Sequence, residues 1–365
     1  MLPTDDQVRL ALAGVREPVL HRTLGELGLA GAVRVDGSKV EVTVALLTDE
    51  HQAVPELDER IVAAVGAVDG VTDVTIHHAV LDDERRGVLV NQLHQQRITF
   101  TDPGMKTRVL LISSGKGGVG KSSVTVNLAL ALRGLGREVA VVDADVWGFS
   151  IPAMLGIDQP PVLVDNRMII PPSAYGVTLA SIGFFVAEDQ PVVWRGPMLH
   201  KALEQFLSDF YWGEPDYLVV DMPPGTGDIA ISLAGFLPTA EAYVVTTPQP
   251  AAQRVAQRAG LMFQSSHVKI PVRGVIENMS WFTGDDGTRY ELFGAGGGQH
   301  LAERLDVPLI GQVPLLPELR EGGDEGNPIM VTNPDSEPAR AFVAIAEWID
   351  EHKPTKRRNS ALKIS

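Results

Sequence analysis

The chain has 365 residues, a formal net charge of −15 and no cysteine. The acidic balance disfavours a nucleic-acid-binding surface, because phosphate binding needs clustered basic residues. The absence of cysteine excludes disulfide bonds and any thiolate metal site built from this chain alone. No apolar run approaches the roughly 20 residues of a membrane span, and no signal-peptide pattern begins the chain, so we expect a cytoplasmic protein that does not bind membranes.

Residues 1–82 are predicted to form a small α+β domain, because alternating strands and amphipathic helices follow one another there. The expected elements are the helix DDQVRLALAGV, the strand KVEVTVALLT, the helix ELDERIVAAVGAV and the strand GVTDVTIHHAV. Residues 83–107 are charged and end in a stretch with Pro and Gly, which indicates a short helix followed by an interdomain linker.

Residues 108–353 alternate between apolar runs and helical patterns. Near-continuous apolar strands separated by helices predict an α/β domain with a mainly parallel sheet covered by helices on both faces. The expected strands are residues 109–113, 139–143, 177–182, 217–221, 242–247, 272–278 and 308–313, with a hairpin at 162–172. Residues 354–365 are polar and basic, and a flexible tail is expected there.

The stretch GKGGVGKSS matches the phosphate-binding pattern G-x-x-x-x-G-K-[ST] between a predicted strand and a predicted helix. Its glycines let backbone N–H groups converge on phosphate oxygens, towards which the helix directs its positive end. Lys121 is expected to contact the β- and γ-phosphates and Ser122 to ligate Mg²⁺. A glycine-rich turn with chance lysines is the alternative, and the strand-loop-helix order disfavours it. The predicted nucleotide-binding residues here are Gly115, Lys116, Gly117, Gly118, Val119, Gly120, Lys121, Ser122 and Ser123.

Three aspartates follow the predicted strands nearby. Asp221 ends the strand YLVVD, and a carboxylate at that edge of a parallel sheet suits a Mg²⁺ ligand. Asp143 and Asp145 follow the second strand of the domain and could support Mg²⁺ or orient a water molecule. Taken alone, Asp143 and Asp145 are equally well explained as solvated loop acids. A lone Asp at a strand end is usually a helix cap or a turn former, but the nearby phosphate-binding loop favours the metal ligand for Asp221.

The second lysine of the loop, Lys116, carries a resemblance to a known class. With it the loop resembles the deviant Walker A motif K-G-G-x-G-K-[ST] of the MinD/ParA/NifH-like P-loop ATPases. The resemblance implies that Lys116 reaches across a homodimer interface to the nucleotide of the partner, as an arginine finger does.

From about Thr107 to Asp350 the chain resembles the Mrp/ApbC family of iron–sulfur cluster carrier ATPases, and residues 5–80 resemble a small iron–sulfur assembly domain. The segments that carry the resemblance include DADVWGFSIPAMLG, WRGPMLHKALEQFL, DYLVVDMPPGTGDIAISL, IENMSWF, GDEGNPIMV and, in the small domain, REPVLHRTLGELGLA.

The resemblance implies ATP hydrolysis to ADP and phosphate, with ATP and Mg²⁺ as cofactors. Asp145 matches the acid that positions the attacking water, Asp143 begins the same motif, and Asp221 is the Walker-B-like acid. Asn278 matches the residue whose amide meets the adenine edge, and Pro314 is implied to line the other side of the base.

One departure from the family pattern concerns the metal cargo. Cluster-carrying members usually have a C-x-x-C pair shortly after this ENMS segment, and two pairs in a dimer supply four thiolates. Gly284 and Gly287 stand at about those positions here, and the nearby Asp285 and Asp286 are poor substitutes for thiolates. The sequence therefore predicts no iron–sulfur ligands in this chain, and a cluster is implied by resemblance only.

Three functions follow as hypotheses. The first is an ATP-driven homodimeric switch in iron–sulfur cluster assembly or transfer, with apoprotein clients or assembly proteins as partners. The second is a cluster-free ATPase scaffold or regulator whose small domain recruits a client. The third is a ParA- or MinD-like positioning ATPase, which the acidic composition disfavours.

Overall fold

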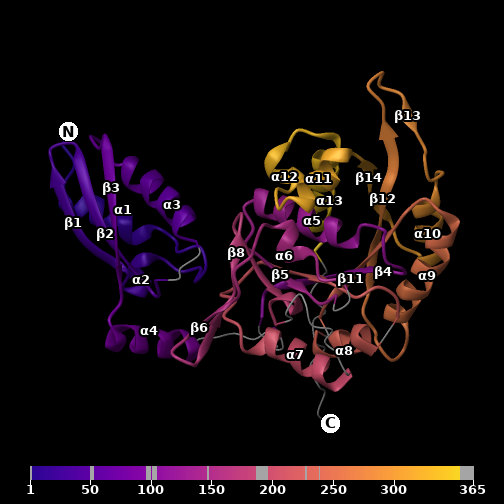
Figure 1. The fold of residues 1–365 in the computed structure, drawn as a ribbon, viewed down its shortest axis with the longest axis horizontal. Coiled ribbons are helices and arrows are strands. Elements are labelled where there is room, and N and C mark those ends of the chain that lie inside the picture. The colour runs from indigo at the N-terminus through magenta and orange to yellow at the C-terminus, as the bar shows by residue number, and fades with distance from the viewer. Residues whose placement is uncertain are drawn as a thin grey trace, which may run out of the picture.

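The computed structural model describes residues 2–49, 53–95, 100, 105–145, 148–185, 196–226, 228–237 and 239–353. Figure 1 shows a small N-terminal sheet set beside a larger sheet that carries helices on both sides. None of the described helices is long and apolar enough to cross a membrane. The expected tail at 354–365 and part of the expected linker, 96–99 and 101–104, lie outside the described residues.

The small sheet has three strands in the order β1-β2-β3, with β1 antiparallel and β3 parallel to β2. Its elements are α1 (Asp5–Gly14), α2 (Leu24–Leu27), β1 (Ala30–Asp36), β2 (Lys39–Leu46), α3 (Val54–Gly66) and β3 (Asp73–Val80). The sequence prediction missed β1 and α2. Helix α1 begins where it does because Thr4 and Gln7 form a reciprocal capping box, and it buries Val8 and Leu12.

The large sheet has nine strands in the order β13-β12-β11-β4-β10-β5-β9-β8, with β14 also paired to β12. The strands are β4 (Arg108–Ser114), β5 (Val139–Asp143), β8 (Ser173–Ala174), β9 (Val177–Ser181), β10 (Tyr217–Asp221), β11 (Glu241–Thr246), β12 (Val272–Thr283), β13 (Arg289–Tyr290) and β14 (Leu309–Leu315). Only the short strands β8 and β13 pair in the antiparallel sense within this described sheet. The predicted mainly parallel sheet is confirmed, although β12 extends five residues beyond the expected end at residue 278.

Both faces of the large sheet are covered, which explains the near-continuous apolar strands. In β4, Val109 and Leu111 join one buried cluster, whereas Leu110 and Ile112 join the cluster on the opposite face. The first face packs against α7 (Gly196–Ser208), α8 (Asp228–Phe236), α9 (Pro250–Gln264) and α10 (Gly297–Leu305). The second packs against α5 (Lys121–Gly134), α6 (Ile151–Met154) and α13 (Glu337–Glu351). The remaining elements are η1 (Ile182–Phe185), α11 (Pro317–Asp324) and α12 (Ile329–Thr332).

Helix α4 (Asp83–Gln95) follows the small sheet in the chain. It is bonded to a hairpin that comes from the other part of the molecule and consists of β6 (Val162–Val164) and β7 (Met168–Ile170). Arg86 on α4 pairs with Asp165 in the hairpin turn at 3.0 Å. Val164, Met168 and Tyr211 are buried in the same apolar cluster as the residues of the small sheet. The segment therefore contributes packing as well as connection.

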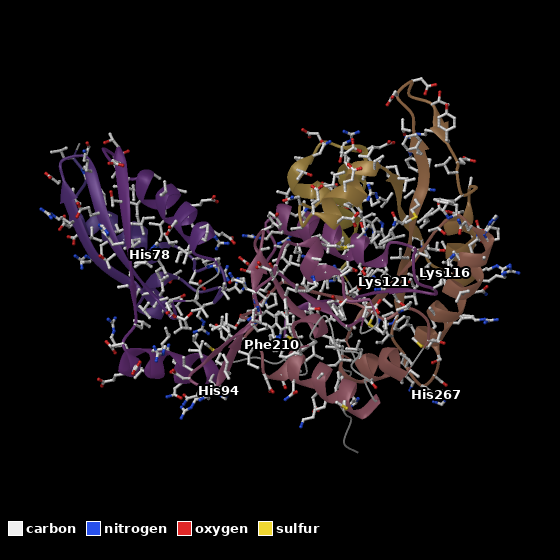
Figure 2. The ribbon with its side chains drawn as sticks, viewed as in Figure 1. His78, His94, Lys116, Lys121, Phe210 and His267 are labelled. Atoms are coloured by element: carbon white, nitrogen blue, oxygen red, sulfur yellow. The ribbon has the colours of Figure 1, made fainter. Side chains whose placement is uncertain are left out.

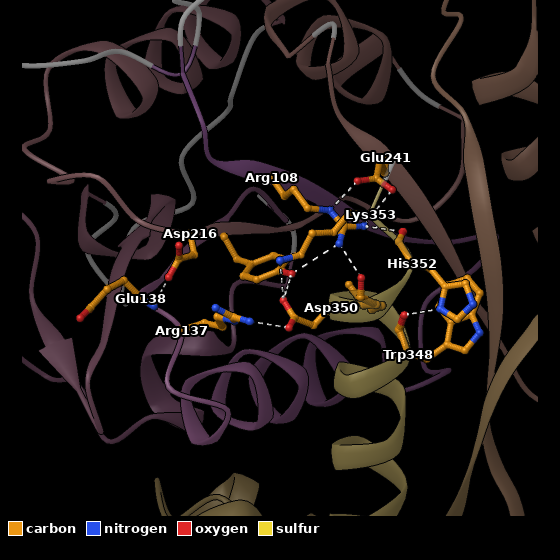
Figure 3. A network of polar contacts seen from close by, with 11 residues as sticks. Arg108, Arg137, Glu138, Asp216, Glu241, Trp348, Asp350, His352 and Lys353 are labelled. Carbon is orange, nitrogen blue, oxygen red and sulfur yellow. Dashed lines mark hydrogen bonds and ion pairs between the residues drawn. The ribbon is translucent and has the colours of Figure 1, made fainter. Parts of the chain in front are cut away.

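A polar network fastens α13 to the edge of the large sheet where its parallel strands begin (Figure 3). Arg108 donates to both carboxylate oxygens of Glu241, at 2.9 and 3.1 Å. Asp350 on α13 accepts from the hydroxyl of Tyr217 at 2.7 Å and from Arg137 at 2.6 Å. The candidate site lies at the opposite edge of the sheet, where these strands end. The network therefore stabilises the packing of α13 on the sheet without occupying the site.

Candidate nucleotide site

The glycine-rich loop lies between the end of β4 and the start of α5, as predicted. Gly118 and Gly120 have φ angles of 79° and 77°, a left-handed conformation that glycine adopts without strain. A Cβ at Gly115 would lie 2.1 Å from the backbone nitrogen of Ala256, so α9 approaches the loop too closely for any other residue. The loop borders an open cavity of about 370 Å³. Its lining includes Lys116, Gly117, Gly118, Gly120, Lys121, Ser122, Ser123, Asp145 and Gly148.

Asp221 gathers the polar groups at the start of α5. Lys121 Nζ donates to Asp221 Oδ2 at 2.7 Å, and Ser122 Oγ donates to the same oxygen at 2.6 Å. The other oxygen, Oδ1, accepts from Thr125 Oγ1 at 2.8 Å. The Asp221 carboxylate is fully buried, so these bonds offset its loss of hydration. Thr125 was missed by the sequence analysis, although it lies one helical turn after Lys121 and so on the same face of α5.

Asp143 is the direct neighbour of Asp221 in the pairing of β5 with β10, and its side chain is fully buried. It accepts from Ser181 Oγ at 3.0 Å and from the backbone N–H of Asp145 at 3.2 Å. Burial, together with the negative charge of Asp221, raises the pKa of Asp143 to about 8. A cation at this place would favour the charged carboxylate.

The oxygens of Ser122, Asp221 and Asp143 are hard donors of the kind that Mg²⁺ prefers. In the described part of the chain, no group of three or more His, Asp or Glu side chains is arranged to hold a metal ion by itself. Magnesium bound here would therefore depend on oxygens of a bound phosphate chain as well, which is its usual manner of binding in nucleotide sites.

The charged residues Asp145 and Lys116 line the loop cavity together with Lys121. Asp145 Oδ2 lies 3.4 Å from Lys121 Nζ. Lys116 is partly exposed, and its backbone carbonyl accepts from Ser114 Oγ at 3.0 Å. Figure 2 shows Lys116 and Lys121 on the large sheet's side of the molecule. Residues 146 and 147, which follow Asp145 in the chain, lie outside the described residues.

Asn278 contacts the loop, whereas neither Asn278 nor Pro314 is among the residues that line its cavity. Asn278 Nδ2 donates to the carbonyl of Val119 at 2.9 Å, so this amide is bonded to the loop itself. Val313 pairs with Asn278 across β14 and β12, which places the buried Pro314 one residue further along. The structure thus brings Asn278 to the loop by a contact that the sequence did not predict.

Gly284 and Gly287, the positions at which the family resemblance implies cysteines, lie in a tight turn between β12 and β13. The N–H of Gly284 donates to the carbonyl of Thr288 at 2.9 Å, and that of Gly287 donates to Gly284. Asp286 accepts from the backbone N–H and the hydroxyl of Thr288 at 2.9 and 2.8 Å, and these bonds lower its pKa. The turn therefore uses its one bonded carboxylate internally and presents no thiolate.

Comparisons with known proteins identify the family to which the chain belongs. The family model described as NUBPL iron-transfer P-loop NTPase matches residues 105–350, and one described as iron–sulfur cluster assembly protein matches residues 5–77. The chain belongs to the NUBPL iron-transfer P-loop NTPase family. The resemblance inferred from the sequence motifs and the predicted fold class are thereby confirmed.

Similar proteins of this family extend over nearly the whole chain. A protein of Mycobacterium leprae named iron–sulfur cluster carrier protein is 45% identical over 95% of this chain and 92% of its own length. One of the same name from Bacillus subtilis is 40% identical over 85% of this chain and 88% of its own.

Solved structures match the nucleotide-binding part. A nucleotide-binding protein of Archaeoglobus fulgidus, in complex with ADP, is 29% identical with a TM-score of 0.56 and covers 69% of this chain and 96% of its own. The septum site-determining protein MinD of Pyrococcus horikoshii, complexed with Mg-ADP, is 26% identical with a TM-score of 0.50, covering 67% of this chain and 96% of its own. A P-loop NTPase fold is therefore established for this family member, while its complete lack of cysteine stands apart from the carrier name of its relatives.

Proposed function

We propose that this family member hydrolyses ATP as a Mg²⁺-dependent homodimeric switch in iron–sulfur cluster assembly or transfer to apoproteins in the cytoplasm. The observation that carries the proposal is the cluster of Lys121, Ser122 and Asp221 at the start of α5. A lysine and a hydroxyl held on one buried carboxylate are groups that can be exchanged onto phosphate and metal when a nucleotide enters. The names of relatives at 40–45% identity support the cluster-related role.

The residues of the site divide the work of binding among them. Backbone N–H groups of residues 115–123 would hold the phosphates, and Lys121 would move from Asp221 to the β- and γ-phosphate oxygens. Ser122, Asp143 and Asp221 would hold Mg²⁺, which neutralises charge on the phosphate oxygens when bound. Asn278 would meet the adenine edge, with Pro314 on the other side of the base.

Hydrolysis then requires a positioned water molecule and positive charge. Asp145 would accept a hydrogen bond from the water, directing its oxygen at the γ-phosphorus as the bond to the β–γ bridging oxygen breaks and ADP leaves. Lys116 would supply a cation to the nucleotide of the partner subunit, so that the site is complete only in the closed homodimer. Its place at the cavity edge, with a partly exposed side chain, suits this role.

The cargo would be handled without thiolates from this chain. We infer that the unit of residues 1–82 recruits a client or assembly protein whose own cysteines hold the cluster, while residues 108–353 form the ATPase and 83–107 connect the two. Residues 354–365 would form a tail. The absence of cysteine also favours a second candidate, an ATPase scaffold or regulator that never contacts a cluster.

The test combines hydrolysis with transfer. The full chain with Mg-ATP is mixed with an apo-ferredoxin and a synthetic thiolate-ligated [4Fe–4S] donor, and phosphate release and ferredoxin reconstitution are followed together. We expect ATP to be hydrolysed and to accelerate reconstitution, and Lys121→Ala to abolish both effects. Lys201→Ala, which changes an exposed lysine on α7, is the matched control. Hydrolysis without any change in reconstitution would favour the scaffold, and no hydrolysis would refute the proposal.

A further inference from the structure

A buried carboxylate on β12 takes no part in the mechanism above. Glu277 directly precedes Asn278 and is only 1% exposed. Because neighbouring side chains on a strand point to opposite faces, the two residues reach in opposite directions. Asn278 reaches the glycine-rich loop, and Glu277 reaches the first turn of α10.

Glu277 is held entirely by neutral donors. The backbone N–H of Gly298, in the first turn of α10, donates to Oε2. Oε1 accepts from Gln312 Nε2 at 2.7 Å and from Ser280 Oγ at 2.9 Å. No cation among the described residues forms an ion pair with it. Burying a carboxylate without such bonds costs free energy. Removing one of these donors, or the charge of Glu277, should therefore disturb the structure around it.

These bonds close an irregular turn of β12. Met279 has a φ of 55°, a left-handed conformation that is unfavourable for a residue other than glycine. The pairing of β12 with β14 shifts register between Asn278 and Phe282, which marks a bulge at the same place. Ser280 Oγ is bonded both to the carboxylate of Glu277 and to its backbone carbonyl, at 3.0 Å. The carboxylate thus ties Ser280, within the bulge, to Gln312 on β14 and to the first turn of α10.

The bulge in turn holds the loop. Asn278 Nδ2 is bonded to the carbonyl of Val119, and a Cβ at Gly120 would lie only 2.2 Å from that nitrogen. The amide is therefore packed against the residue that precedes Lys121. A shift of the bulge would change the place of both Asn278 and the loop.

We propose that Glu277 is a positioning residue of the nucleotide site, which holds the bulge at Met279 so that Asn278 remains bonded to the loop. This role rests on the nucleotide-binding function proposed above. It links α10 and β14 to the loop through one strand and does not require Glu277 to touch the nucleotide.

A double-mutant cycle tests the proposal, with the Mg-ATP dissociation constant and Tm measured for Glu277→Gln, Asn278→Ala and the double variant. The glutamine amide would turn an N–H₂ group towards the donors that now face a carboxylate. We expect Glu277→Gln to weaken ATP binding about tenfold in the otherwise unaltered chain, and less than twofold when Asn278 is already alanine. Glu303→Gln, an exposed change on α10, is the control and should leave the constant unchanged.

Two further measurements keep the test decisive. Should Glu277→Gln fail to fold, Ser280→Ala removes one bond across the bulge without altering the buried charge, and it should also weaken binding only when Asn278 is present. In turnover assays Glu277→Gln should raise KM and leave kcat unchanged, which a general loss of stability would not do.

Equal weakening in both Asn278 backgrounds, or a lowered Tm with unchanged ATP affinity, would overturn the positioning role alone. Absence of ATP binding by the unaltered chain would overturn the proposed function and this role with it.

Discussion

Strand β12 contacts the candidate nucleotide site through Asn278 and ends in a hairpin with β13. These two regions differ in how their polar groups are used. At the nucleotide end, Lys121 lies between Asp221 and Asp145 at 2.7 and 3.4 Å, beside an open cavity. At the hairpin end, the polar groups of the turn between Gly284 and Gly287 bond to one another. The polar groups at the nucleotide end can exchange their present partners for a ligand. Those of the hairpin turn are already bonded to one another.

The hairpin is also fastened at its base. Glu337, the first residue of α13, accepts from Trp281 Nε1 at 3.2 Å, Thr283 Oγ1 at 2.9 Å and Arg289 at 2.9 Å. The guanidinium of Arg289 lies 4.3 Å from the ring centroid of Trp281. The hairpin is therefore held firmly at its base, and it carries no thiolate at the positions where the family resemblance implies cluster ligands. The comparison teaches that polar groups beside a cavity remain available to a ligand, whereas polar groups bonded within a turn do not.

The largest effect is expected from Lys121→Ala. It removes the cation that would hold the β- and γ-phosphates, so we expect ATP binding to fall by at least about a hundredfold, to below detection in isothermal titration calorimetry. The change also leaves the buried Asp221 without its cation, and a lower Tm should accompany it. Unaltered ATP affinity in this variant would contradict the assignment of the loop.

Lys116→Ala should separate binding from turnover. Each monomer keeps Lys121 and its loop, so the ATP dissociation constant should stay within about twofold, while phosphate release should fall by roughly a hundredfold or more for lack of the cation supplied in trans. Binding is measured by calorimetry and turnover by phosphate release at saturating ATP. Wild-type turnover would show that Lys116 has no such role.

Two cysteines placed in the hairpin should enable it to bind iron through thiolates. The double variant Gly284→Cys with Gly287→Cys should bind about two iron atoms per chain after anaerobic reconstitution, as expected for one [4Fe–4S] cluster bridging a dimer. Its Tm should fall, because Gly287 has a φ of 77° and a Cβ at Gly284 would lie 3.0 Å from Asp286. Serines at both positions are the control for strain. Equal iron contents in the cysteine and serine variants would show that the hairpin cannot hold a cluster even when thiolates are supplied.

A smaller effect concerns the acidic pair at the nucleotide end. Asp143 has a pKa raised to about 8 from 3.8, so between these values the folded state binds a proton that the unfolded state has lost. This contribution to stability is complete below about 3.8 and is lost as the pH rises through about 8. In EDTA and without nucleotide, the Tm of Asp143→Asn minus that of the wild type should therefore increase from pH 5 to pH 8.5. A constant difference would mean that Asp143 is already ionised in the free protein.

The hairpin supplies the contrasting control for that measurement. Bonds from Thr288 lower the pKa of the exposed Asp286, so its contribution is present above 3.8 and is lost only in more acidic solution. The Tm difference for Asp286→Asn should thus stay flat over the range in which that of Asp143→Asn rises.

Much of the fold and part of the site could be predicted from the sequence, for identifiable reasons. The spacing from Gly115 to Ser122 fixes both the residue types and the strand-loop-helix context of a phosphate site. Asp221 followed from its place at the end of an apolar strand. Contacts across long separations did not follow: Asn278 and Val119 are 159 residues apart in the chain and meet only in the folded structure. Strand β1 was missed although the residues AVRVD alternate, because the short turn at Gly37 joins it directly to β2.

The central claim, that this chain hydrolyses a nucleotide but holds no iron–sulfur cluster with its own side chains, is tested most directly by one reconstitution. The full chain is incubated anaerobically with iron, sulfide and Mg-ATP, desalted, and its bound iron, charge-transfer absorption and phosphate release are measured on the same sample. We predict steady phosphate release with no stoichiometric iron. A stable cluster on this cysteine-free chain, or iron without any nucleotide turnover, would contradict the claim.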